Sequence, residues 1–168
     1  DSSNIGEVCQ FAAAGKEIGK KSLAEIAMSY GYVYVAQIAL GANMAQALKV
    51  IKEAEAYNGP SLIIGYAPCE LHGIAKGGMN HCQDEMKKAV KAGYWNLFSF
   101  NPALKAEGKN PFTLDSKAPT KEYQEFIMGE SRYINLKKQN PERAAKLFGE
   151  AEANAKAKYE ALVKRAED

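Results

Sequence analysis

Cysteine and histidine are scarce in this sequence, and its net charge is small. Its 168 residues include three cysteines and two histidines, and the formal net charge is +2. Basic residues are interleaved with acidic ones and form no stripe, which is typical of a solvated mixed surface and predicts no nucleic-acid partner. No apolar run approaches the length of a membrane span, and the N-terminus lacks the basic start and apolar stretch of a signal peptide. We therefore expect no membrane partner.

The three cysteines, Cys9, Cys69 and Cys82, are an odd number and lie far apart in the sequence. We therefore expect no disulfide framework, and this favours a reducing compartment such as the cytoplasm. A cysteine considered alone is more often a small buried apolar residue than a ligand. The chain also begins without an initiator methionine, from which we expect a processed or cut polypeptide.

Two strands with a helix between them are predicted in the first half of the chain. Residues 32–38 are rich in β-branched and aromatic side chains, and residues 61–66 are a continuous apolar run, typical of a strand covered on both faces. Strand, helix and strand in this order predict a βαβ unit with parallel strands. The apolar side of the intervening helix is expected at Met44, Ala47, Leu48, Ile51 and Ala54. The fold class expected is α/β, as part of a doubly wound sheet.

A helix is also predicted before the first strand, where Ser22 and Glu25 have the spacing of a capping box and Leu23, Ile26 and Ala27 form the apolar side. Further helices are expected at residues 80–92, at 120–138 and from Asn140 to the C-terminus. Residues 95–118 contain Pro102 and Pro111 and are expected to be loop-like. These patterns suggest one domain over residues 1–118 and a helical extension over residues 119–168.

Two strands are too few for a stable doubly wound sheet, and one βαβ unit leaves both faces of such a sheet poorly covered. We therefore expect the missing strands to come from sequence before Asp1, from another chain or from a partner. The sequence thus predicts a fragment of a larger protein.

Cys69 has the most informative position of the candidate site residues. It follows the second predicted strand by three residues, and in open α/β sheets the working groups lie just past the C-terminal ends of strands. A zinc site built from Cys69, His72, His81 and Cys82 is an alternative on paper. Neighbouring residues on a helix point about 100° apart, so His81 and Cys82 suit one ion poorly.

Six blocks spread over essentially the whole chain form a distinctive set: FAAAGK at residues 11–16, GYVYVA at 31–36, GPSLII at 59–64, YAPC at 66–69, AGYW at 92–95 and GKNPFTLDSKAP at 108–119. This set resembles the C-terminal part of the thiamine-diphosphate-binding domain of single-chain pyruvate:ferredoxin (or flavodoxin) oxidoreductases. The resemblance implies an enzyme that oxidises pyruvate with coenzyme A to acetyl-CoA and carbon dioxide. Thiamine diphosphate and Mg²⁺ carry the carbon chemistry in that family, and [4Fe–4S] clusters pass the electrons to ferredoxin or flavodoxin.

The resemblance also assigns a role to Cys69. It falls on the family's isolated fourth thiolate ligand of the cluster nearest the thiamine, whereas Cys9 and Cys82 match no ligand. The family's Gly-Asp-Gly segment and Asn-Thr-Gly-Gly-Gln segment are expected before Asp1, so the chain alone is expected to bind neither thiamine nor a cluster tightly. The resemblance further implies the remainder of the same enzyme as a partner, a homodimer when intact, and a cytoplasmic or hydrogenosomal location.

Two alternatives stay open at this point. The chain could be a non-catalytic structural or interaction domain that keeps the fold and works through its C-terminal helices. It could also belong to an oxidoreductase for a different 2-oxoacid, because the residues that contact the substrate are expected mostly elsewhere.

Overall fold

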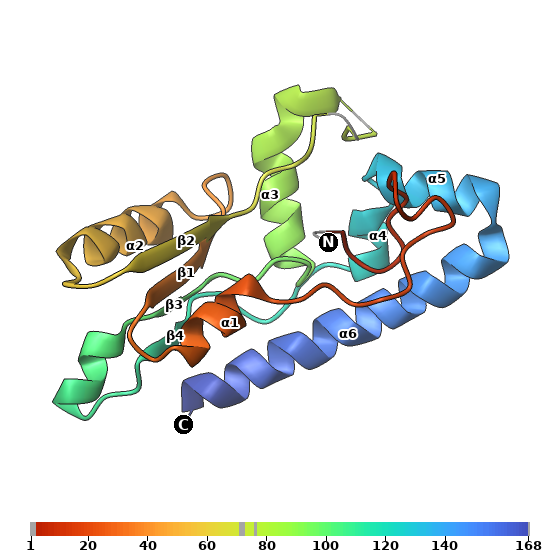
Figure 1. Ribbon diagram of the computed structural model, residues 1–168. Helices are drawn as coiled ribbons and strands as arrows, with labels where there is room; N and C mark the ends of the chain where they lie inside the picture. The colour runs from red at the N-terminus through yellow and green to blue at the C-terminus, as the bar shows by residue number, and fades with distance from the viewer. Residues whose placement is uncertain (1–2, 71–72, 76, 168) are drawn as a thin grey trace.

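The computed structural model describes residues 3–70, 73–75 and 77–167. Within these residues a four-stranded sheet has the order β2-β1-β3-β4 (Figure 1). Its strands are β1 (Tyr34–Ile38), β2 (Ser61–Gly65), β3 (Phe98–Phe100) and β4 (Phe112–Leu114). β1 and β2 are parallel, with Tyr34 opposite Ser61, and the other two pairings are antiparallel. The predicted α/β class and its parallel strand pair are therefore confirmed.

Strands β3 and β4 correct the prediction that residues 95–118 are loop-like. Each strand has three residues, which is too short for an alternating pattern to be visible in the sequence. Phe100 lies opposite Val35 on β1 and Phe112 on β4, so β3 is the strand that joins β4 to β1. The short 3-10 helix Pro102–Glu107 connects the two strands. The expectation of a sheet with only two strands from this chain is therefore wrong.

Both faces of β1 are covered within the chain, which also corrects the expectation of poorly covered sheet faces. Tyr34, Ala36 and Ile38 pack against α2 (Met44–Ala56) on one face. On the other face, Val35 and the phenylalanines of β3 and β4 pack against α1 (Leu23–Ser29) and the C-terminal end of α6 (Pro141–Glu167). Figure 1 shows α2 on one side of the sheet and α1 with α6 on the other. All five residues of β1 are buried as a result.

The ends of the helices follow local side-chain chemistry. The Ser22 side chain accepts a hydrogen bond from the Glu25 backbone N–H at 3.2 Å, which confirms half of the predicted capping box. Asn43 caps α2 in the same way, accepting from the Gln46 N–H at 3.0 Å. Gly31 has a φ of +79°, which allows the chain to turn from α1 towards β1.

Two helices and one strand leave apolar side chains exposed, contrary to prediction. Ala24, Ala27 and Met28 are the buried residues of α1, while Leu23 and Ile26 are exposed. On α2 the buried positions are Gln46, Ala47 and Val50. Three residues that were expected to face inward form an outer apolar face of α2: Met44, Leu48 and Ile51. Strand β2, expected to be covered on both faces, is instead a partly exposed edge strand because, among the described strands, it pairs with β1 alone.

The single helix predicted over residues 120–138 is divided into α4 (Tyr123–Ile127) and α5 (Ser131–Gln139). Helical bonding is interrupted at the junction because Gly129 and Ser131 bond instead to another segment. The Ala75 N–H donates to the Gly129 carbonyl at 2.8 Å, and the Ser131 N–H donates to the Gly73 carbonyl at 3.3 Å. The predicted helix over 80–92 is a 3-10 turn (Gly78–His81) followed by α3 (Cys82–Lys91).

The second core lies away from the sheet, where α4, α5 and α6 pack together with α3 and the N-terminal segment. Tyr133, Leu136 and Leu147 are almost fully buried there. Figure 1 shows the N-terminal segment crossing these C-terminal helices before it reaches α1. Because α6 also contributes Leu162 to the core beneath the sheet, it links the two halves of the molecule. Within the described residues, no helix is long and apolar enough to span a membrane.

Candidate functional site

A cavity of about 390 Å³ lies beyond the C-terminal end of β2. Its lining comes from segments far apart in the sequence, and its most polar part includes Glu7, Tyr66, Cys69, Tyr94 and Arg132. Lysines 20, 21 and 158 line it as well. Burial is the main cause that lowers the pKa of both Lys20 and Lys158. The cavity therefore has basic groups on more than one side, with one buried carboxylate among them.

Cys69 reaches this cavity because the chain is fixed just after β2. The Tyr66 N–H donates to the Ile38 carbonyl at 3.0 Å, which extends the pairing with β1 by one residue. The Tyr66 ring lies 5.6 Å from the Trp95 ring and 6.0 Å from the Tyr94 ring, measured between centroids. Cys69 follows as a half-buried cysteine. Its predicted position at the end of a strand is confirmed.

The segment after Cys69 is bonded to the junction between α4 and α5. The Gly73 N–H donates to the Cys69 carbonyl at 2.9 Å. Gly73 and Ala75 in turn make the two backbone bonds to Ser131 and Gly129 described above. The start of α5 is therefore tied directly to the loop that carries the cysteine.

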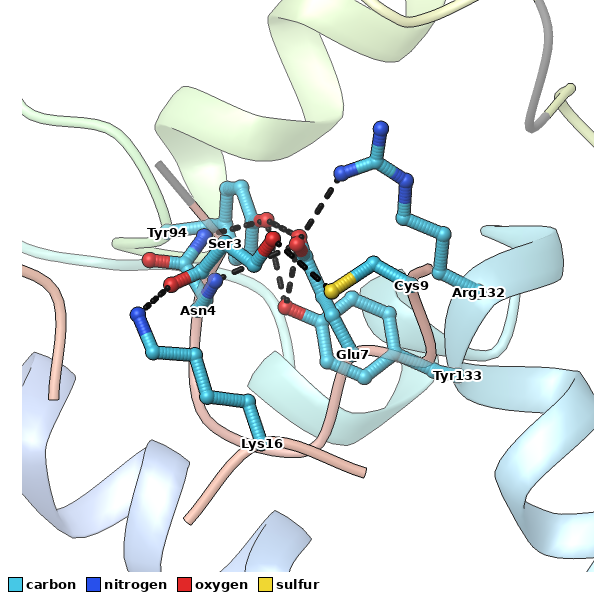
Figure 2. Close-up of polar contacts among 8 residues, drawn as sticks. All are labelled: Ser3, Asn4, Glu7, Cys9, Lys16, Tyr94, Arg132 and Tyr133. Carbon is cyan, nitrogen blue, oxygen red and sulfur yellow. Dashed lines mark hydrogen bonds and ion pairs between the residues drawn. The ribbon is translucent and has the colours of Figure 1, made fainter. Parts of the chain in front are cut away.

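Glu7 is the centre of a buried polar network (Figure 2). Its Oε1 accepts from the Tyr94 hydroxyl at 2.9 Å and from the Tyr133 hydroxyl at 3.4 Å. Its Oε2 accepts from the Asn4 backbone N–H at 3.1 Å and from Arg132 Nη1 at 3.0 Å. Burial, followed by the negative charge of Glu7, raises the pKa of the Tyr94 hydroxyl well above its ordinary value, so it stays protonated as a donor.

Arg132 has two polar neighbours on the cavity side, Glu7 and Cys69. Burial by itself lowers the pKa of the Arg132 guanidinium. The Glu7 carboxylate and then the Cys69 sulfur raise that pKa by more than burial lowers it, so it lies above its ordinary value. A thiolate is the form in which cysteine ligates metals.

Two further carboxylates lie behind this network. Glu85 is almost fully buried and accepts from Lys88 Nζ at 3.0 Å. The pKa of Glu130 is raised to about 7, first by burial and then by the negative charges of Glu85 and Glu7. Glu130 also has a hydrogen bond with the Tyr66 side chain, which partly offsets this rise. Glu7, Glu85 and Glu130 therefore form a group of electrostatically coupled carboxylates.

The other predicted candidates do not join Cys69. Cys9 lies in the N-terminal segment, where its sulfur accepts from the Ser3 hydroxyl at 3.4 Å. Cys82 begins α3, and His81 is exposed with its Nδ1 3.9 Å from Asp84. His72 lies outside the described residues. In the part of the chain that is described, no three His, Cys, Asp or Glu side chains are grouped to hold a metal ion.

Sequence reasoning missed Glu7 and Arg132 as site residues. They are 125 residues apart, so no motif spacing connects them. What the arrangement offers chemically is a single soft sulfur donor beside a fixed positive charge.

No family model matches the chain. Among curated relatives, the pyruvate:ferredoxin oxidoreductase of Moorella thermoacetica is 56% identical over 98% of this chain and 14% of its own length. The pyruvate-flavodoxin oxidoreductase of Klebsiella pneumoniae is 49% identical over 94% of this chain and 13% of its own length. The mitochondrial pyruvate dehydrogenase [NADP(+)] of Euglena gracilis is 48% identical over 94% of this chain and 9% of its own length.

This chain thus spans between 9% and 14% of these three relatives. Identity of this size over almost all of the chain establishes common descent with one segment of these enzymes. The chain is therefore homologous to one segment of the pyruvate:ferredoxin and pyruvate:flavodoxin oxidoreductases.

Proposed function

We propose that this chain is part of an enzyme that oxidatively decarboxylates pyruvate with coenzyme A to acetyl-CoA and carbon dioxide. The electrons pass through [4Fe–4S] clusters to ferredoxin or flavodoxin. The observation that carries this proposal is the 56% identity to a pyruvate:ferredoxin oxidoreductase over 98% of the chain. The reducing environment favoured by the cysteine content agrees with a cytoplasmic or hydrogenosomal enzyme.

The chain's own contribution is one thiolate, from Cys69, to the cluster nearest the thiamine. Three observations support this assignment: Cys69 follows the end of β2, it lines the cavity, and its sulfur has the Arg132 guanidinium as a neighbour. A cubane cluster takes four thiolates. Among the described residues, no group of three or more His, Cys, Asp or Glu side chains could hold a metal ion. We therefore assign the other three thiolates to the remainder of the enzyme.

Thiamine diphosphate with Mg²⁺ would supply the carbanion chemistry of the reaction when bound. Magnesium prefers carboxylate and carbonyl oxygens together with phosphate oxygens. The described part of this chain contains no cluster of acidic side chains suited to a cation. We assign no residue of the chain to the Mg²⁺–diphosphate group and place its binding segments elsewhere in the enzyme.

The exposed apolar surface of the chain suits packing against the remainder of the same enzyme. Leu48 and Ile51 of the outer apolar face of α2 are 53% and 44% exposed. Leu62 is exposed on β2, whose second edge has no partner among the described strands. An apolar helix face beside an open sheet edge is a surface on which another part of a protein packs. In the intact enzyme we expect it to be covered, within a homodimer.

The test compares the intact enzyme with the isolated 168-residue chain. The intact enzyme should reduce ferredoxin or flavodoxin when given pyruvate and coenzyme A, and the isolated chain should neither turn over nor bind thiamine diphosphate with Mg²⁺. Preference of the intact enzyme for another 2-oxoacid would replace the substrate assignment. Intact protein without any 2-oxoacid oxidation would instead favour a structural or interaction domain.

A further inference from the structure

We propose that Arg132 is a positioning residue for the cluster thiolate of Cys69, and that its positive charge favours the reduced state of the cluster. The inference rests on the proposed role of Cys69 as a ligand. It assigns a function to the junction between α4 and α5, which the sequence placed inside one continuous helix over residues 120–138. Two features of the structure carry it, the backbone connections of the cysteine loop and the fixed location of the guanidinium.

The backbone connections make the position of Cys69 dependent on the start of α5. Gly73 bonds to Cys69 through its N–H and to Ser131 through its carbonyl, at 2.9 and 3.3 Å. The Ala75 N–H bonds to the Gly129 carbonyl at 2.8 Å. Arg132 follows Ser131 directly. A shift of α5 would therefore move both the cysteine loop and the arginine that faces its sulfur.

The guanidinium is held from its other side by Glu7. Nη1 of Arg132 lies 3.0 Å from Glu7 Oε2, and the Arg132 side chain is 21% exposed. Glu7 is itself fixed by the Tyr94 hydroxyl at 2.9 Å and the Asn4 N–H at 3.1 Å (Figure 2). A charge fixed in this way loses little by reorganisation when charge changes next to it. Arg132 is thus preorganised to face a negative sulfur.

The surrounding charges make the positive charge of Arg132 important. Glu7 lines the cavity together with Lys20, and Glu85 and Glu130 are electrostatically coupled to each other and to Glu7. Reduction of a cluster adds one negative charge. Carboxylates nearby oppose that change, while a cation in contact with a cluster sulfur favours it. Loss of Arg132 therefore leaves the acidic groups without the cation that directly faces the sulfur.

The experiment uses the intact enzyme with Arg132→Gln and Arg132→Lys, and Arg143→Gln as a matched control. Arg143 also pairs with a glutamate of the N-terminal segment, at 2.8 Å from Glu17, but it does not line the cavity. EPR-monitored titration with dithionite gives the reduction equilibrium of each cluster. Release of iron to a chelator gives the stability of ligation.

In Arg132→Gln, the reduction equilibrium of one cluster should shift towards the oxidised form by up to about tenfold, which is about 59 mV for a one-electron couple. Iron release should be faster by about tenfold, within the range seen when groups that orient metal ligands are removed. Arg132→Lys keeps the charge and should keep most of the reduction equilibrium while losing part of the resistance to iron release. Arg143→Gln should match the unmodified enzyme in both measurements.

Unchanged reduction equilibria and unchanged iron release in Arg132→Gln would overturn the inference. If Arg132→Gln assembles no cluster, the Arg132→Lys variant distinguishes an effect of charge from an effect on folding. Equal cluster loss in this charge-retaining variant would show that Arg132 is needed for folding alone. Cys69→Ala separates this failure from failure of the proposed function. A cluster lost in Cys69→Ala but insensitive to Arg132→Gln leaves the ligand role standing and removes only the role of Arg132.

Discussion

The replacement Glu7→Gln tests the buried network that holds Arg132. Glu7 is 5% exposed and its two carboxylate oxygens accept from four donors. An amide of the same shape has only one acceptor oxygen. Its NH₂ group would therefore face either the Asn4 N–H and Arg132 or the two tyrosine hydroxyls. In either orientation, donors that are satisfied in the native chain lose their acceptor.

The expected cost follows from the groups involved. A hydrogen bond to a charged group contributes about 1.5–3 kcal/mol, and removing one partner of a fully buried ion pair costs about 3–5 kcal/mol. Arg132 is 21% exposed and keeps part of its hydration. We therefore expect Glu7→Gln to lower the free energy of unfolding by about 2–3 kcal/mol, and the melting temperature by about 4–12 °C for a chain of this size.

Urea unfolding of the chain, followed by circular dichroism, measures this change, with Glu17→Gln as the control. Glu17 also pairs with an arginine, at 2.8 Å from Arg143, but its side chain is 63% exposed. An exposed pair contributes between about 0 and 1 kcal/mol. Equal and small effects of the two replacements would show that the Glu7 network does not stabilise the fold, and would refute the reasoning from burial.

Three further replacements test other parts of the structure. Burial is the main cause that raises the pKa of Glu130 to about 7 in the folded chain, so ionisation of this carboxyl destabilises the fold as the pH rises from about 4.5 to 7. Glu130→Gln should therefore leave the free energy of unfolding almost unchanged at pH 4.5 and raise it by about 1–2 kcal/mol at pH 8, after allowing for the partial exposure of Glu130. A stabilisation independent of pH would contradict this. Leu136→Ala should cost about 2–5 kcal/mol in urea unfolding, because Leu136 is fully buried. Leu48→Ala should change the stability of the isolated chain by less than about 0.5 kcal/mol but destabilise the intact enzyme, and equal effects in both would show that the outer apolar face of α2 is not covered.

The parts of the fold that could be predicted from the sequence are those with a strong local signal. β1 and β2 have enough β-branched and apolar residues to be recognised, and Ser22 marks the start of α1. Strands β3 and β4 have no such signal, because three residues cannot establish a period. The break between α4 and α5 was invisible for another reason: it depends on bonds from Gly73 and Ala75, more than fifty residues earlier in the chain.

The buried side of α2 was predicted only in part, because Ala47 and Ala54 pack in the core whereas Met44, Leu48 and Ile51 are exposed. Val50 and Ala47 face β1, while Met44 and Leu48 point away from it. A period of 3.6 residues identifies an apolar stripe without saying what covers it. The site shows the same limit. The position of Cys69 at a strand end followed from the strand pattern, but its neighbours Glu7 and Arg132 meet only through tertiary structure.

The most direct test of the central claim is the iron content and EPR spectrum of the intact enzyme carrying Cys69→Ala, with Cys82→Ala as the control. If Cys69 supplies a cluster thiolate, Cys69→Ala should lose one cluster, about four iron atoms, or alter its signal, while thiamine binding is retained. Cys82→Ala should leave every cluster signal intact. A Cys69→Ala enzyme with the full iron content and unchanged spectra would contradict the account.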